Sequence, residues 1–155
     1  MLKKYLPFII SVSISLGIGC LSAFLTRKSM SIYSEINRPM LSPPSWLFPI
    51  VWTVLFVLMG IAAAKIWCSN GREIDSSLIF YGFQLVFNFC WSLIFFNFRA
   101  FGFAFFWLVG LLVLIGITMI KFYRIDKTAG WIMLPYFAWV SFAGYLNFAI
   151  WRMNP

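Results

Sequence analysis

The chain leaves its longest polar connection and enters a long apolar run at Pro43-Pro44-Ser45-Trp46-Leu47-Phe48-Pro49-Ile50-Val51-Trp52. Pro44 suits the first turn of a helix, where its missing N–H is harmless. Pro49 lies about one turn further on, so we expect it to remove a backbone hydrogen bond and bend the helix. Trp46 and Trp52 flank that bend. Such a helix start can form one wall of a pocket inside a membrane, although interfacial tryptophans and prolines near helix starts also occur in many membrane proteins.

The composition around this stretch is that of an integral membrane protein. Hydrophobic residues make up 63% of the 155 residues and charged residues only 10%. A bilayer-spanning helix needs about 20 mostly apolar residues. Five stretches meet that length and contain no Asp, Glu, Lys or Arg, namely Tyr5–Thr26, Pro39–Ala64, Ser76–Phe98, Ala100–Ile120 and Thr128–Trp151.

We therefore predict an all-α integral membrane protein, a five-transmembrane-helix bundle that forms one domain over residues 1–155. The first run lacks a small-residue cleavage site, so we expect it to be a helix rather than a signal peptide. The expected helices cover residues 5–26, 44–67, 76–98, 101–121 and 128–151, and a lid loop covers residues 27–43.

The formal net charge of +8 does not indicate a nucleic-acid partner, because most of the basic residues stand at helix ends. There they anchor the spans to the lipid bilayer and bias orientation. Seven basic residues fall on one side and five on the other, so the orientation stays open. The chain has no histidine and its three cysteines form no CxxC pair. We therefore expect no metal site.

The third predicted span carries amides at membrane depth. Gln84 and Asn88 are four residues apart and share one helix face, which Trp91 continues. Amides are costly in hydrocarbon unless they face the bundle interior and find partners. Hydrogen bonding between helices and contact with a ligand explain them equally well. In the fourth span, only Trp107 is a candidate contact.

The fifth predicted span contains a stripe of residues that an apolar core would not select. Tyr136, Trp139, Ala143 and Asn147 recur at i, i+3, i+7 and i+11, which places them on one face of a helix. The stripe combines a hydroxyl, an indole, a small residue and an amide. We expect it to face a cavity or a polar seam.

The available chemistry excludes several functions. All four acidic residues lie in connections, so proton relays and ion-coupled pumping are not expected. An aromatic, lightly polar interior with basic rims suits a flat apolar ligand that carries an anionic edge. Arg27, Lys28 or Arg38 could meet its carboxylates. Without histidine, haem iron would lack its usual axial ligand, so we expect a metal-free macrocycle and no obligatory cofactor.

At this point the sequence resembles a known family. The motifs are Ser42-Pro43-Pro44-Ser45-Trp46 with Trp52-Thr53, the Asn88 to Trp91 segment, and Pro135-Tyr136-x-x-Trp139 through Leu146-Asn147 to Trp151. Together they resemble the TspO/MBR family, which includes bacterial tryptophan-rich sensory proteins and the translocator protein or peripheral benzodiazepine receptor. The resemblance covers nearly the whole chain.

The resemblance implies a five-helix bundle, commonly a homodimer, with a pocket beneath the first loop. That pocket would bind porphyrins such as protoporphyrin IX, isoquinoline carboxamides and benzodiazepines. The family's paired tryptophans, linked to light-dependent porphyrin degradation, fall on Trp52 and Trp139, which are therefore the candidate catalytic residues. The predicted ligand-binding residues are Tyr33, Pro43, Trp52, Gln84, Asn88, Trp91, Trp107, Tyr136, Trp139, Ala143 and Asn147.

One departure from the family concerns a cholesterol motif proposed for the animal proteins. Here Phe148 stands where the motif has its tyrosine, and Tyr145 is too far from Arg152 to replace it. Such motifs are weak patterns, and we predict no cholesterol recognition by that route.

We expect a multi-pass protein of a bacterial membrane rather than of the mitochondrial outer membrane.

These residues and the family resemblance together suggest three functions. The first is a membrane protein that senses or translocates tetrapyrroles by binding them in the bundle. The second is an enzyme that degrades porphyrin in light. The third is a porphyrin or small-molecule transporter, which the small size and uncharged interior disfavour.

Overall fold

The computed structural model describes residues 2–155, and every regular element in that range is a helix. Five segments are long and apolar enough to cross a membrane: Lys3–Thr26, Leu47–Trp67, Ile74–Asn97, Phe101–Ile125 and Lys127–Met153. The predicted all-α fold with five membrane helices is confirmed.

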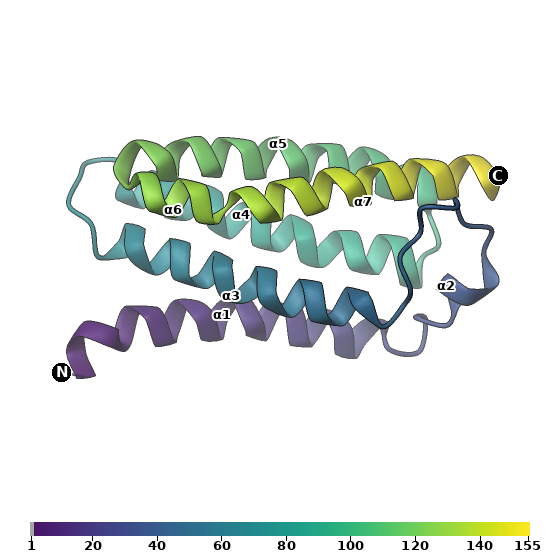
Figure 1. Ribbon diagram of the computed structural model, residues 1–155, viewed down its shortest axis with the longest axis horizontal. Coiled ribbons are helices and arrows are strands. Elements are labelled where there is room, and N and C mark those ends of the chain that lie inside the picture. Colours follow the sequence, from purple (N-terminus) through teal and green to yellow (C-terminus); the bar gives the residue numbers. More distant parts are fainter. Residues whose placement is uncertain (1) are drawn as a thin grey trace.

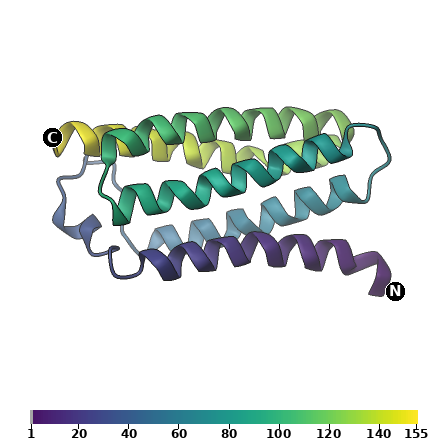
Figure 2. The same ribbon diagram turned by 180° about the vertical axis from the view of Figure 1, so that it is seen from behind.

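The long helices run side by side as a bundle, and the labelled ends of the chain lie at opposite ends of it (Figures 1 and 2). A short helix, α2, and the loop around it lie at the same end as the last residues. The elements in chain order are α1 (Leu2–Thr26), α2 (Ile32–Glu35), α3 (Leu47–Trp67), α4 (Ile74–Ser92), the π-helical turn η1 (Leu93–Asn97), α5 (Phe101–Ile125), α6 (Lys127–Ile132) and α7 (Leu134–Met153).

Helix α3 begins later than its prolines suggested. It starts at Leu47, not at residue 44, so Pro49 is its third residue. The first turn of a helix has backbone N–H groups without intrahelical partners, and a proline there removes nothing. The prediction that Pro49 removes a backbone hydrogen bond of the helix was therefore wrong. Trp46 stands just outside the helix and is 65% exposed, as an interfacial side chain would be.

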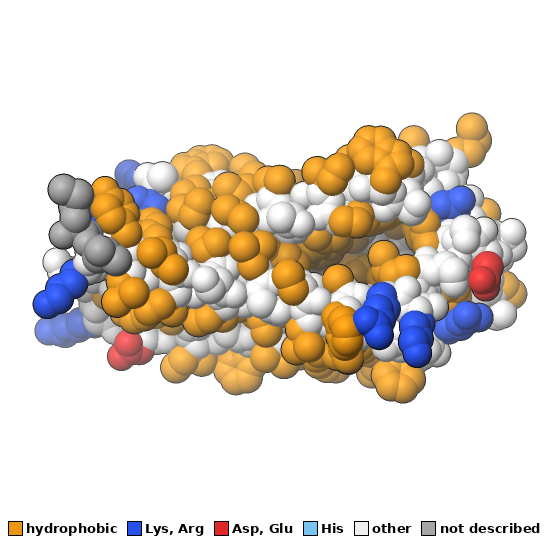
Figure 3. Space-filling view, turned by 90° about the horizontal axis from the view of Figure 1, so that it is seen from below, with side chains coloured by type: hydrophobic (Ala, Val, Ile, Leu, Met, Phe, Trp, Pro, Cys, Tyr) orange, Lys and Arg blue, Asp and Glu red, His pale blue; other side chains and the backbone are white. Residues whose placement is uncertain are grey.

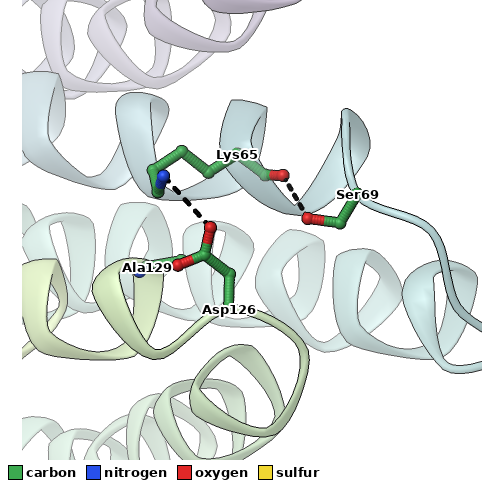
Figure 4. A network of polar contacts seen from close by, with 4 residues as sticks. All are labelled: Lys65, Ser69, Asp126 and Ala129. Carbon is green, nitrogen blue, oxygen red and sulfur yellow. Dashed lines mark hydrogen bonds and ion pairs between the residues drawn. The ribbon is translucent and has the colours of Figure 1, made fainter.

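The fifth span is broken into α6 and α7 at Met133. Pro135 stands in the first turn of α7, where it suits a new helix start better than a continuing one. Asp126 begins α6 by accepting a hydrogen bond from the Ala129 backbone N–H at 3.1 Å. Its other oxygen lies 3.0 Å from Nζ of Lys65 on α3, and these contacts tie the two helices together (Figure 4).

Helices α1 and α3 pack closely because α3 carries a glycine at the contact. A Cβ added at Gly60 would lie 2.5 Å from the Val12 Cα atom. Gly60 and Ala64 are both buried, and small residues at this spacing let neighbouring helices approach closely. The connection between η1 and α5 is short, and its residue Arg99 has a left-handed backbone conformation with a φ of 52°.

Candidate functional site

The bundle contains a cavity of about 440 Å³ near the end that α2 covers. In Figure 3 the surface is hollowed at this end of the molecule, and Lys and Arg side chains stand beside the hollow. The walls come from α1, the lid loop, α3, α4, η1 and α7. The lining residues are Gly19, Ser22, Ala23, Thr26, Met30, Ser31, Tyr33, Ser34, Ser45, Phe48, Pro49, Trp52, Phe56, Asn88, Trp91, Ser92, Phe95, Phe96, Ala143, Leu146, Asn147 and Ile150.

The roof of the cavity is built around Tyr33 on α2. Its hydroxyl donates to the Pro43 carbonyl at 3.0 Å, and its ring meets Phe48 edge-on with centroids 5.1 Å apart. The Arg38 guanidinium lies 4.5 Å from the centre of the same ring. Tyr33, a predicted ligand-binding residue, lines the cavity. Pro43 is not in the lining, and its carbonyl instead holds Tyr33 in place.

One wall of the cavity is aromatic and comes from the start of α3. Phe48, Trp52 and Phe56 recur at four-residue spacing, so their rings lie along one face of the helix. The Trp52 ring lies 5.7 Å from Phe56 and 6.3 Å from Tyr136, centroid to centroid. Trp52, a predicted ligand-binding residue, therefore lies in the cavity wall.

A buried chain of polar side chains begins at Asn88 in the cavity wall. The Asn88 amide donates to the Tyr136 hydroxyl at 2.8 Å, and that hydroxyl donates to Gln84 Oε1 at 2.7 Å. Gln84 Nε2 contacts the Met59 sulfur at 3.7 Å. Only Asn88 lines the cavity. Gln84 and Tyr136 have no exposed surface and do not line the cavity, so they lie behind Asn88 and are joined to it by hydrogen bonds.

Trp91 and Asn147 form a second polar pair in the lining. The Trp91 indole N–H donates to Asn147 Oδ1 at 3.0 Å. Asn147 in turn donates to the Phe101 carbonyl at 2.8 Å. Because these groups are already hydrogen-bonded to the protein, Trp91 offers a ligand mainly its ring face.

A match across nearly the whole chain identifies the family. The sequence profile of the TspO/MBR family matches residues 10–152. The chain belongs to the TspO/MBR family. The tryptophan-rich protein TspO of Chlorobaculum tepidum is 37% identical over 158 residues, which cover 99% of both chains. The tryptophan-rich sensory protein of Cereibacter sphaeroides is 34% identical over 79% of this chain and 76% of its own.

The TspO/MBR relatives also include animal proteins. The human translocator protein is 31% identical over 146 residues, 89% of this chain and 85% of its own. The chain is therefore a multi-pass membrane protein of a family whose members are named as sensory proteins and as translocators.

The two tryptophans paired by the family resemblance lie in different places in this TspO/MBR chain. Trp52 lines the cavity, whereas Trp139 lines a separate groove of about 480 Å³ between α3 and α7. Trp139 comes three residues after Tyr136, which turns it about 60° around the helix. Its ring lies 5.9 Å from that of Phe48. Its indole N–H is buried without a hydrogen-bond partner among the described residues.

Trp107 is outside the cavity of this family member. Its indole N–H donates to the Phe87 carbonyl at 2.9 Å, and its ring stacks on Phe87 with centroids 4.4 Å apart. The prediction placed it in the site because it was the only candidate contact in its span. The structure gives it a packing role between α4 and α5.

Part of the cavity wall was not predicted from the sequence. Gly19, Ser22, Ala23 and Thr26 of α1 line it. These small residues stand at i, i+3, i+4 and i+7, so the signal was present as a helical stripe. Phe95 and Phe96 were also missed. They lie in η1, and π-helical turns are often found at functional sites, but their apolar sequence gives no warning of one.

The residues of the cavity suit binding better than metal chemistry. Within residues 2–155, no group of three or more Cys, Asp, Glu or His side chains gathers to hold a metal ion. The cavity offers aromatic faces, a few hydroxyls and the Asn88 amide. This arrangement can hold a flat apolar molecule and fix its orientation through a small number of polar contacts.

Proposed function

We propose that this TspO/MBR protein binds a porphyrin such as protoporphyrin IX in the cavity beneath the lid loop. The observation that carries the proposal is the cavity itself, whose volume of about 440 Å³ lies in the range of small-molecule sites. Aromatic rings on its walls can pack against the faces of a flat macrocycle. Isoquinoline carboxamides and benzodiazepines are also aromatic and largely apolar, and they are proposed as further ligands.

The basic side chains at the roof support an anionic edge on the ligand. Arg38 lies over the Tyr33 ring, and Tyr33 lines the cavity. Arg27 directly follows Thr26, another lining residue. Guanidinium groups bind carboxylates through paired hydrogen bonds. We propose that the propionates of a porphyrin point toward the lid loop and its cations.

The relatives support a sensory or translocator role for this binding, because their names carry those words. The bacterial relative from Chlorobaculum tepidum is 37% identical and the human protein 31%. Because the chain is more similar to this bacterial relative than to the human protein, we propose a bacterial membrane as the location of the protein.

The proposal is tested by titrating protoporphyrin IX against the full chain in detergent or nanodiscs and following tryptophan fluorescence quenching. Ala143 lines the cavity, so we expect Ala143→Leu to bind at least about tenfold more weakly, because the larger side chain takes space that the ligand would occupy. Asn88→Ala removes the polar contact and should also weaken binding. Ala138→Leu is the matched control, because Ala138 lines the separate groove.

Equal porphyrin affinity in wild type, Ala143→Leu and Asn88→Ala would rule out this cavity as the site. A thermal unfolding measurement on each variant separates a lost site from a lost fold. Quenching that persists in the pocket variants but disappears in Ala138→Leu would move the site to the groove between α3 and α7.

Light-dependent porphyrin degradation is the second candidate function, and the Trp52 ring in the cavity wall favours it. A porphyrin in the cavity would lie against Trp52, whereas Trp139 faces the outer groove. Under illumination in air, we expect Trp52→Phe to slow the bleaching of the bound porphyrin and Trp139→Phe to slow it less. Equal bleaching in both variants and the wild type would argue against a role for either indole.

A further inference from the structure

The lid loop is attached to the segment that follows α7. The Asn37 backbone N–H donates to Asn154 Oδ1 at 3.1 Å, and Asn154 Nδ2 donates to the Asn37 carbonyl at 2.9 Å. The Asn37 side chain adds a longer bond of 3.4 Å to the Met153 carbonyl. We call these bonds the Asn37–Asn154 clasp. It joins residues 117 positions apart, across the end of the bundle that carries the cavity.

The Asn154 amide is fully used by this arrangement. Besides its two bonds to Asn37, its Nδ2 group donates to the Ile150 carbonyl at 2.8 Å. An asparagine amide has two N–H donors and one carbonyl oxygen, and each of these has a partner here. Asn154 therefore closes the end of α7 and holds the lid loop with the same group, so the position of the loop is fixed relative to α7.

The lid loop has an inner attachment at the cavity roof and an outer one at the end of α7. The inner one is Tyr33, which is 6% exposed and whose ring packs on Phe48 of α3, while its hydrogen bond to the Pro43 carbonyl lies within the loop. The outer one is the Asn37–Asn154 clasp. Beyond it the loop turns toward solvent, and Met40 is fully exposed. Since Tyr33 and its neighbours form the roof, moving the loop away from α7 would uncover the cavity.

We propose that Asn154 is a positioning residue that holds the lid loop closed, and that it thereby sets how fast ligands enter and leave the cavity. The proposal rests on the proposed function, because it assumes that the cavity binds a ligand. Asn154 does not line the cavity, so it acts through the loop and not by touching the ligand.

The expected signature is a change in rates with little change in affinity. The clasp lies outside the cavity and can form whether the cavity is empty or filled. Weakening it therefore shifts the balance between closed and open lid by the same amount in both states. Binding and release both require the open lid, so both rates rise together and their ratio, the dissociation constant, changes little.

The test compares Asn154→Ala with Asn97→Ala in the full chain. Asn97 is a matched control, since its exposed amide donates at 3.2 Å to the Leu25 carbonyl, which belongs to α1 and not to the lid loop. Stopped-flow mixing with protoporphyrin IX, read by tryptophan quenching, gives both rate constants. For Asn154→Ala we expect each to rise roughly three- to tenfold, as hydrogen bonds of modest net strength are lost. We expect a dissociation constant within about twofold of wild type.

Hydrogen exchange of the ligand-free protein gives a second readout. The Asn37 amide proton is itself part of the clasp, so its exchange should quicken in Asn154→Ala and stay unchanged in Asn97→Ala. Asn154→Asp keeps the acceptor but replaces both donors by a charged oxygen facing two carbonyls. It should therefore loosen the loop as well.

Unchanged rates in Asn154→Ala, or weaker affinity without faster binding, would overturn the role of Asn154 while leaving porphyrin binding intact. If the wild type bound no porphyrin, the proposed function would fail and the role in ligand exchange with it. The hydrogen exchange of the Asn37 amide would then still decide whether Asn154 holds the lid loop.

Discussion

At the scale of single residues, the site depends on side chains that a ligand would not touch. Asn88 faces the cavity, but its orientation is set by Tyr136 and Gln84 behind it. A half-satisfied polar chain in a low-dielectric interior is unfavourable, because each lost partner leaves a buried group without a hydrogen bond. The hydroxyl of Tyr136 is the central member, since it both accepts and donates.

Removing that hydroxyl should therefore destabilise the fold. We expect Tyr136→Phe to lower the free energy of unfolding by about 1 to 2 kcal/mol, in line with hydrogen bonds inside membrane proteins and with the two amide partners left behind. Thermal unfolding in detergent measures the change. Tyr145→Phe is the control, because Tyr145 lies on the same helix but is 46% exposed. A loss of similar size in both variants would contradict the argument.

At the scale of elements, the contact between α1 and α3 depends on the absence of a side chain. Gly60→Ala would bring a Cβ to 2.5 Å from the Val12 Cα, so the helices would have to separate. We expect a loss of stability of about 1 to 3 kcal/mol, the usual cost of overpacking.

Gly82→Ala is the matched control for that prediction. It stands within α4, where an added Cβ would meet nothing within 4 Å. The same substitution there should be neutral or stabilising by up to about 1 kcal/mol, because alanine favours helix more than glycine does. Equal effects of the two substitutions on the unfolding temperature would mean that close packing at Gly60 is not needed.

The ion pair between Lys65 and Asp126 makes the α3 to α6 contact depend on pH. Partial burial alone raises the pKa of Asp126, but hydrogen bonds from Lys65 and the Ala129 N–H, with the charge of Lys65, outweigh it and lower the pKa below its ordinary value of 3.8. A lowered pKa means that the folded state favours the carboxylate. The stabilisation is complete above pH 3.8 and is lost as the pH falls through the lowered pKa.

Substitution of Asp126 separates its two contacts. Asp126→Asn keeps an oxygen for the Ala129 N–H and removes the charge, so we expect a loss of about 0.2 to 1 kcal/mol at pH 7, typical of exposed pairs. Asp126→Ala should cost about 1 kcal/mol more, because the cap of α6 is lost too. The difference between wild type and Asp126→Asn should shrink toward pH 3 in thermal unfolding, and a constant difference would contradict the charge argument.

At the scale of the whole molecule, hydrophobic run length was enough to predict the fold. Five charge-free runs leave helices as the form that satisfies their backbone groups in lipid. Element ends were harder to predict, because a proline fits several positions in a first helical turn, and α3 starts at Leu47, between Pro44 and Pro49. In the site, Trp139 shares a stripe with Tyr136 and Ala143, but a turn of about 60° takes its ring to the outer groove.

Five spans also determine which connections share a side of the membrane. Only α3 crosses the membrane between Met40, in the lid loop, and Cys68, after α3, so these two residues lie on opposite faces. Both residues are exposed. In oriented vesicles of a variant with Cys20→Ser and Cys90→Ser, a membrane-impermeant maleimide added outside should label either native Cys68 or, in Met40→Cys with Cys68→Ser, the new thiol, but not both. The labelled position fixes the orientation that the charge count left open. Labelling of both from one side of sealed vesicles would mean that α3 does not cross the membrane, and the cavity built on it would lose its wall.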